Sequence, residues 1–228
     1  MTEKKFSDSE LYEATYGYKE QRSTRRFLLG ILLAFLLLLG IRLYASNAFV
    51  GVIVDGPSMN TTLYHGEQLL MRLADDKHKA VRGDVIVVDV SGYDECNGVE
   101  SGFIIKRLIA TEYDKVYCED GNVYICYADA PEKGFQLYDD IHAYYPSAKA
   151  KEAYDFASRE NPYEVKKGEV FFLGDNRTNS KDSRYMEGHS SLKDRLYKEA
   201  DIYGIVPQWA IDNQRILEWI FFPKGLFK

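Results

Sequence analysis

The fold is decided by residues 102–126, GFIIKRLIATEYDKVYCEDGNVYIC, in which short apolar segments alternate with turn residues. Clusters of apolar and β-branched residues bounded by Gly, Asp or Asn are typical of strands. Asp120-Gly121 is a strong hairpin signal, and a two-residue turn there would place Cys118 opposite Val123. The pattern therefore predicts a mainly β protein. Comparable clusters occupy residues 49–54, 68–73, 84–90, 169–173 and 201–206.

Residues 128–167 differ from the strand-rich segments on either side. They are rich in Tyr, Ala, Lys and Glu without regular alternation, and residues 148–158 have a helix-like composition. We interpret residues 113–167 as a smaller inserted α+β subdomain, and residues 46–112 and 168–228 as the main β domain. A chain of 228 residues with a hydrophobic share of 46% is large enough to fill such a core.

An apolar run from Phe27 to Ile41 contains no charged residue and predicts one transmembrane helix over residues 27–45. Extension through Ala45, with Arg42 reaching the membrane surface, gives the roughly 20 residues that cross a bilayer. The alternative is a cleaved signal peptide, since Ser46-Asn47-Ala48 has a small-x-small pattern. The 26 residues ahead of the run are long for the start of a signal peptide, which favours the transmembrane helix.

Basic residues near the ends of this helix predict its orientation. Arg22, Arg25 and Arg26 precede it, whereas the next basic residue beyond it is Arg72. The positive-inside rule therefore places the N-terminal segment, residues 1–26, in the cytoplasm and the β domain on the other side of the membrane.

Charge and residue counts limit the kinds of partner and cofactor. The formal net charge of −6 gives no electrostatic case for binding nucleic acid. The four histidines contain no pair with the spacing of a zinc site, so no metal is expected. Cys96, Cys118 and Cys126 are an odd number of cysteines, and we expect all three to be unpaired.

A serine stands on a predicted turn in Val54-Asp55-Gly56-Pro57-Ser58-Met59, where Gly and Pro end a strand. A serine hydroxyl needs a base to become nucleophilic at neutral pH, and a backbone N–H at the turn can begin an oxyanion hole. The motif is not the Gly-x-Ser-x-Gly elbow, because Asn60 stands where the second glycine belongs. Taken alone, a Gly-Pro-Ser sequence is more often an ordinary turn.

Two adjacent cations, Lys106 and Arg107, interrupt an otherwise apolar strand. Strand alternation sends them to opposite faces. If Ile104, Lys106 and Leu108 share the inward face, burial lowers the lysine pKa, and the neutral amine can accept a proton from serine. The alternative is that both cations protect an exposed sheet edge from aggregation.

Residues 174–184, GDNRTNSKDSR, follow an apolar strand and are dense in side chains that make directional hydrogen bonds. Such a loop is suited to holding a catalytic lysine in place. The alternative is a solvated turn in which Asp182 and Arg184 form an exposed ion pair of little energetic value. We call residues 174–184 the closing loop.

Taken in this order, the segments resemble the motifs of bacterial type I signal peptidases, and in particular their Gram-positive-like variants. The nucleophile motif corresponds to Gly56-Pro57-Ser58-Met59, and the lysine motif corresponds to Ile105-Lys106-Arg107. Residues 82–88, RGDVIVV, are similar to the conserved strand between these two motifs, and the closing loop is similar to the family's Gly-Asp-Asn-Arg motif.

The resemblance implies a role for each matched residue. Ser58 would attack the scissile carbonyl, Lys106 would remove the serine proton, and Ser180 would hydrogen-bond the lysine amine. The Ser58 backbone N–H would donate to the oxyanion. The remaining matched residues would support the site or contact substrate: Asp175, Asp182, Arg107 and Arg184 as support, and Gly56, Pro57 and Met59 beside the oxyanion.

The resemblance also implies a substrate class and a fold. Family members remove signal peptides from exported preproteins after small-x-small sites, through an acyl-enzyme and without a cofactor. Their fold is a mainly β catalytic domain with a smaller inserted subdomain, anchored in the lipid bilayer. The alternative hypothesis is a membrane-anchored assembly or binding module of the same fold without hydrolytic activity. A self-cleaving repressor is disfavoured, because the apolar run stands where its DNA-binding domain would be.

Overall fold

The computed structural model describes residues 7–92, 102–138, 140–184 and 197–216. The chain forms two units, residues 1–48 and residues 49–228, which are described separately.

The first unit is a single helix, α1 (Asp8–Ala48), of 41 residues. Within it, Arg22–Tyr44 is long and apolar enough to cross a membrane. A helix of this length spans about 34 Å, compared with a bilayer core of about 30 Å. The helix includes the predicted segment 27–45 and begins well before it. It also continues through Ser46-Asn47-Ala48, the alternative cleavage site.

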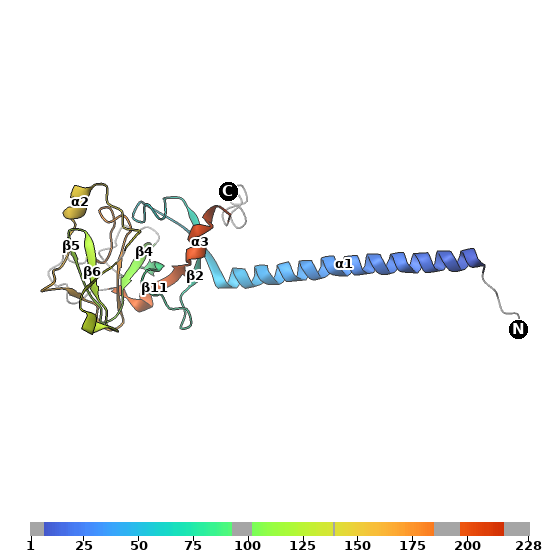
Figure 1. The fold of residues 1–228 in the computed structure, drawn as a ribbon, viewed down its shortest axis with the longest axis horizontal. Helices are drawn as coiled ribbons and strands as arrows, with labels where there is room; N and C mark the ends of the chain where they lie inside the picture. Colours follow the sequence, from blue (N-terminus) through green and yellow to red (C-terminus); the bar gives the residue numbers. More distant parts are fainter. Residues whose placement is uncertain (1–6, 93–101, 139, 185–196, 217–228) are drawn as a thin grey trace. The chain divides into compact units, whose positions relative to one another are not determined.

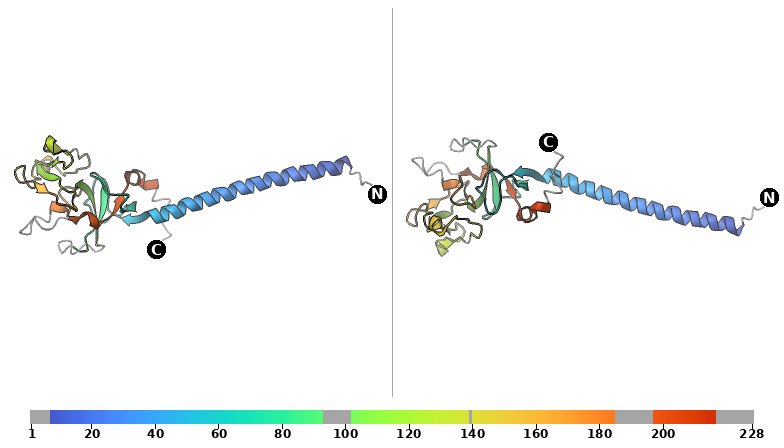
Figure 2. Two further views of the ribbon diagram at one scale, coloured as in Figure 1. Left: turned by 90° about the horizontal axis from the view of Figure 1, so that it is seen from below. Right: turned by 90° about the horizontal axis from the view of Figure 1, so that it is seen from above.

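The second unit is built on a seven-stranded antiparallel sheet with the order β1-β2-β11-β3-β4-β9-β10 (Figures 1 and 2). Strands β1 and β10 form its edges, whereas β4 is interior and pairs with β3 and β9. The strands are β1 (Phe49–Ile53), β2 (Gln68–Leu73), β3 (Val85–Asp89), β4 (Phe103–Ala110), β9 (Glu169–Leu173), β10 (Tyr197–Lys198) and β11 (Ile202–Val206).

A second sheet has the strand order β7-β6-β5-β8. Its central hairpin joins β5 (Lys115–Glu119) to β6 (Asn122–Cys126) through Asp120 and Gly121, whose φ angles are 51° and 71°. Cys118 pairs with Val123, as the turn sequence predicted. The other elements are β7 (Gln136–Leu137), β8 (Tyr163–Glu164), α2 (Ala148–Glu152), α3 (Gln208–Asp212) and the 3-10 turns η2 (Pro131–Lys133) and η4 (Glu199–Asp201).

Within the part of the second unit that the structure describes, three apolar clusters form the core. Two of them contain side chains from alternate positions of the large sheet, such as Val85 and Val87 in one and Ile86 and Val88 in the other. The third joins β4 and β9 to the smaller sheet, with Phe171 packing in the same cluster as Ile125. The mainly β architecture that the sequence predicted is confirmed. The third cluster contains side chains from residues 113–167 and from the main β domain, so it does not separate the two. The domain boundaries at 112/113 and 167/168 therefore remain a prediction.

Several local expectations need correction. The helix expected over residues 148–158 ends at Glu152. Beyond it, Tyr154 and Phe156 turn into the third cluster, and Phe156 forms a β-bridge with Cys118. Core packing of these two aromatic side chains therefore overrides helix propensity. Strands β7, β8 and β10 were not predicted; with two residues each, they are too short to show a period.

Candidate active site

Ser58 lies on a tight turn directly after the edge strand β1. Gly56 has a φ of 82°, a conformation that favours glycine, and its N–H donates to Nδ1 of His65 at 3.2 Å. Asn60 N donates to Pro57 O at 3.1 Å, which closes the turn. Met59 is buried and anchors the turn in the core, whereas Ser58 itself is half-buried. Among the described residues, the Ser58 N–H donates to no protein acceptor, as an oxyanion donor requires.

The closing loop holds this turn in place. Asn176 donates twice to it, from its backbone N–H to Ser58 O at 3.0 Å and from Nδ2 to Pro57 O at 3.1 Å. Gly174 is packed so closely that a Cβ there would lie 2.5 Å from Ser58 O and 2.1 Å from Oγ of Ser180. The absence of a side chain at position 174 therefore permits the contact between loop and turn.

Lys106 lies in the interior strand β4 and is only 3% exposed. Its neighbours on the same face, Ile104 and Leu108, both belong to one apolar cluster, as strand alternation predicted. The Nζ of Lys106 lies 2.8 Å from Oγ of Ser58, and it donates to Ile105 O at 2.7 Å. The alternative of a solvent-exposed sheet edge is wrong, because β4 pairs on both sides.

Arg107 points to the opposite face and is also buried. Its Nε and Nη2 donate to the two carboxylate oxygens of Asp175 at 2.8 and 2.7 Å, and its Nη1 donates to Gly83 O at 2.7 Å. Thr62 Oγ1 donates to Oδ2 of the same carboxylate at 2.6 Å. The ion pair thus connects β4, the closing loop and the segment that follows the Ser58 turn.

Asp182 and Arg184 form a second ion pair inside the closing loop. Arg184 Nε and Nη2 donate to the two carboxylate oxygens at 2.8 and 2.9 Å, while Oδ2 of Asp182 also accepts from Gly174 N at 3.0 Å. The Asp182 side chain is fully buried, and the Arg184 guanidinium stacks over the Tyr154 ring at 4.5 Å. The alternative of an exposed ion pair is therefore wrong, and the pair fixes the backbone at Gly174.

The Ser180 hydroxyl does not make the hydrogen bond to the Lys106 amine that the resemblance implied. The hydroxyl is buried, but among the described residues it has no hydrogen-bond partner. The amine instead contacts Ser58 Oγ and Ile105 O.

Two contributors to the site were not singled out from the sequence. Asn176 lies within the closing loop, but its two bonds to the nucleophile turn could not be inferred from the motif. Thr62 showed no signal at all, since its contact with Asp175 joins residues far apart in the chain. Among the described residues, no cluster of His, Cys, Asp and Glu side chains is arranged to hold a metal ion.

The chain matches the family model described as signal peptidase, peptidase S26, over residues 24–218. It therefore belongs to the peptidase S26 family of signal peptidases. Signal peptidase I T of Bacillus subtilis is 31% identical over 161 residues, covering 68% of this chain and 72% of the relative. Signal peptidase I of Bacillus licheniformis is 30% identical over 182 residues, covering 72% of this chain and 83% of the relative.

Among solved structures, a signal peptidase I from Enterococcus faecalis is 27% identical, with a TM-score of 0.39. The alignment covers 57% of this chain and 98% of the Enterococcus chain. Membership of the family supports removal of signal peptides from preproteins as the activity of this chain. Together with the apolar segment Arg22–Tyr44, it indicates a membrane-anchored protein.

Proposed function

We propose that the chain is a serine endopeptidase in which Ser58 is the nucleophile and Lys106 the general base. The observation that carries this proposal is the 2.8 Å separation between Lys106 Nζ and Ser58 Oγ. This distance is within the range required for proton transfer between a nucleophile and its base. As a general base, Lys106 would act in its uncharged form, and the residue is only 3% exposed.

The reaction would proceed through an acyl-enzyme. Ser58 Oγ attacks the scissile carbonyl carbon while its proton passes to Lys106 Nζ, and the Ser58 N–H donates to the resulting oxyanion. Collapse of this intermediate breaks the peptide bond, and the leaving amine takes the proton from Lys106. A water molecule then gives a proton to Lys106 and attacks the ester carbonyl. The ester C–O bond breaks, Lys106 returns the proton to Ser58 Oγ, and the signal peptide leaves with a new C-terminal carboxylate.

The supporting residues would keep this pair aligned. Arg107 and Asp175 tie β4 to the closing loop, and Asp182 and Arg184 fix the loop at Gly174. We assign these four residues to positioning, because their charged groups bond one another and the backbone.

The substrate would bind as an extended peptide beside a sheet edge. Strand β1 is an edge strand and leads directly to Ser58, so a peptide added to it would pass the nucleophile. The expected cleavage sites have small residues at the first and third positions before the cut. The N-terminus would be cytoplasmic and the β domain extracytoplasmic, because Arg22, Arg25 and Arg26 precede the membrane segment.

Co-expression with a secreted precursor tests the proposal. The parent chain should shorten the precursor, whereas Ser58→Ala and Lys106→Ala should leave it at full length while accumulating to the parent's level in the membrane. Processing at the parent rate by either variant would overturn the mechanism. Absence of processing by the parent would favour the non-hydrolytic alternative.

A further inference from the structure

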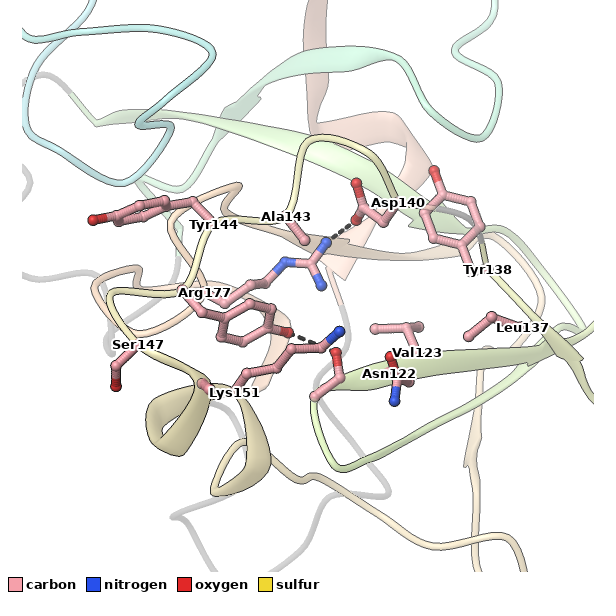
Figure 3. Close-up of a pocket in the computed structure, with 13 residues that line it drawn as sticks. Asn122, Val123, Leu137, Tyr138, Asp140, Ala143, Tyr144, Ser147, Lys151 and Arg177 are labelled. Carbon is pink, nitrogen blue, oxygen red and sulfur yellow. Dashed lines mark hydrogen bonds and ion pairs between the residues drawn. The ribbon is translucent and has the colours of Figure 1, made fainter.

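A pocket of about 440 Å³ lies away from Ser58 and Lys106, neither of which lines it. It is bordered by the β5–β6 turn, helix α2 and the closing-loop residue Arg177 (Figure 3). The rest of its described lining is Leu137, Tyr138, Asp140, Ala143, Tyr144 and Tyr145. The peptidase reaction proposed above assigns no chemical step to this pocket or to Arg177.

Arg177 supplies one cation to the pocket and is only 1% exposed. Its Nε donates to Gly174 O at 3.1 Å, and its Nη2 pairs with the carboxylate of Asp140. The remaining nitrogen, Nη1, is buried and has no hydrogen-bond partner among the described residues. Figure 3 shows the guanidinium extending into the hollow. Burial lowers the pKa of Arg177 to about 10, which still leaves it a cation at neutral pH.

Lys151 supplies a second cation from helix α2. Its side chain crosses Gly121 so closely that a Cβ at that glycine would lie 2.4 Å from the Lys151 Cγ. Lys151 lines the same pocket as Arg177, and in Figure 3 its side chain also extends into the hollow. Within the described part of the chain, no carboxylate forms an ion pair with Lys151. Among the described residues, Arg177 Nη1 has no acceptor and Lys151 has no ion-pair partner, so both cations can donate hydrogen bonds to a ligand.

The balance of charge in the pocket favours an anion. Among the described residues, its lining contains Arg177 and Lys151 but only one acid, Asp140, which is already paired with Arg177. A buried N–H of a charged group that lacks an acceptor is costly, and an oxyanion in the pocket would supply one. We propose that this pocket binds a small oxyanion, of the phosphate or carboxylate class, between Arg177 Nη1 and the Lys151 amine.

Phosphorus NMR on the detergent-solubilised full chain tests this inference with inorganic phosphate as the probe, and acetate is tested as a competitor. The phosphate line should broaden on addition of the parent protein at constant ionic strength. Lys151→Gln should weaken phosphate binding on the order of tenfold, because it removes a charge-assisted hydrogen bond. Lys151 is chosen over Arg177, whose backbone and side chain help to hold the closing loop.

Lys149→Gln is the matched control, since it removes an exposed cation from the same helix but outside the pocket. It should bind phosphate as the parent does. Equal binding by the parent and by Lys151→Gln would overturn the inference, as would absence of broadening with the parent. Precursor processing by Lys151→Gln should match that of the parent, because this residue lies outside the proposed catalytic machinery.

Discussion

The carboxylate of Asp175 and the guanidinium of Arg107 form a buried bidentate ion pair, with N–O distances of 2.8 and 2.7 Å. Arg107 follows the proposed base in β4, and Asp175 follows Gly174 in the closing loop. The pair therefore joins the strand of Lys106 to the loop that contacts Ser58. Removing one partner of such a pair leaves an uncompensated charge in the interior.

Asp175→Ala should therefore lower the free energy of unfolding by about 3–5 kcal/mol. Thr62→Val is a milder matched change, because it removes one hydrogen bond to the same carboxylate and leaves the ion pair intact. It should cost about 1.5–3 kcal/mol. Denaturant unfolding of both variants measures the difference. A loss for Asp175→Ala no greater than that for Thr62→Val would contradict a structural role for the ion pair.

The close approach at Gly174 predicts a steric effect on the nucleophile turn. In Gly174→Ala, the Cβ would lie 2.5 Å from the backbone oxygen of Ser58 and 2.1 Å from Oγ of Ser180, so the turn or the closing loop must shift. We expect a loss of about 1–3 kcal/mol in unfolding free energy and a much larger loss of cleavage rate. Thermal unfolding and a peptide cleavage assay measure the two effects.

Gly56→Ala separates steric conflict from backbone strain. No atom lies within 4 Å of a Cβ at Gly56, but its φ of 82° disfavours a side chain. This variant should lose about 1–2 kcal/mol through strain alone. If Gly174→Ala retained more activity than Gly56→Ala, close packing between Gly174 and Ser58 would not be what aligns the nucleophile.

The buried Ser180 hydroxyl predicts a separation of stability from activity. Because it has no hydrogen-bond partner among the described residues, Ser180→Ala should leave the unfolding free energy unchanged or raise it. A buried polar group kept at such a cost is expected to act during the reaction, so the cleavage rate should fall at least about tenfold. Parallel unfolding and kinetic measurements test both parts. Reduced stability with a normal rate would show that the hydroxyl is only structural.

Regular strands of the fold could be predicted because their signals are local. The apolar stretches of β2 and β9 match their predicted bounds, and the turn at Asp120-Gly121 determined the register of Cys118. Strand β8 could not be predicted, since its two residues pair with β5 only through tertiary contact. The helix beginning at Ala148 was predicted too long, because core packing ends it.

The site could be predicted only where its residues belong to recognisable motifs. Ser58 and Lys106 were inferred separately from a turn and from strand alternation, and the structure brings their reactive atoms within hydrogen-bonding distance. The contact of Thr62 with Asp175 has no sequence signal, because the two residues meet only in the folded chain. That the buried Ser180 hydroxyl has no hydrogen-bond partner among the described residues could not be derived from a motif either, since it depends on side-chain geometry.

Cysteine reactivity should follow burial. Burial raises the pKa of the Cys118 thiol to about 12, and its Sγ donates to Tyr154 O at 3.2 Å. Cys126 is half-buried, and neither cysteine forms a disulfide. A thiol alkylating reagent at mildly alkaline pH should therefore modify Cys126 in the native protein and leave Cys118 intact, as read by peptide mass spectrometry. Cys96, which we also expect to be unpaired, lies outside the described residues. Modification of Cys118 at the rate of Cys126 would contradict this prediction.

Cleavage activity should rise with pH and then level off, because only the uncharged Lys106 amine can accept the Ser58 proton. The rate constant kcat/KM for a peptide with a small-x-small site measures this from mildly acidic to alkaline pH. Loss of activity in acid must be separated from unfolding. Burial, followed by the charge of Arg107, lowers the pKa of His142 below its ordinary value of 6.5, while Asp175 opposes the shift.

As pH falls, His142 is protonated in the unfolded chain before it is protonated in the folded chain. The His142 contribution to stability is therefore present above pH 6.5 and is lost as pH falls from there toward the folded-state pKa. Unfolding midpoints recorded at each pH therefore serve as the control. The rate should already decline at pH values where the midpoint is constant, since protonation of the base requires no unfolding. A rate that is flat wherever the fold is intact would be incompatible with Lys106 as the general base, even though its amine lies 2.8 Å from the serine oxygen.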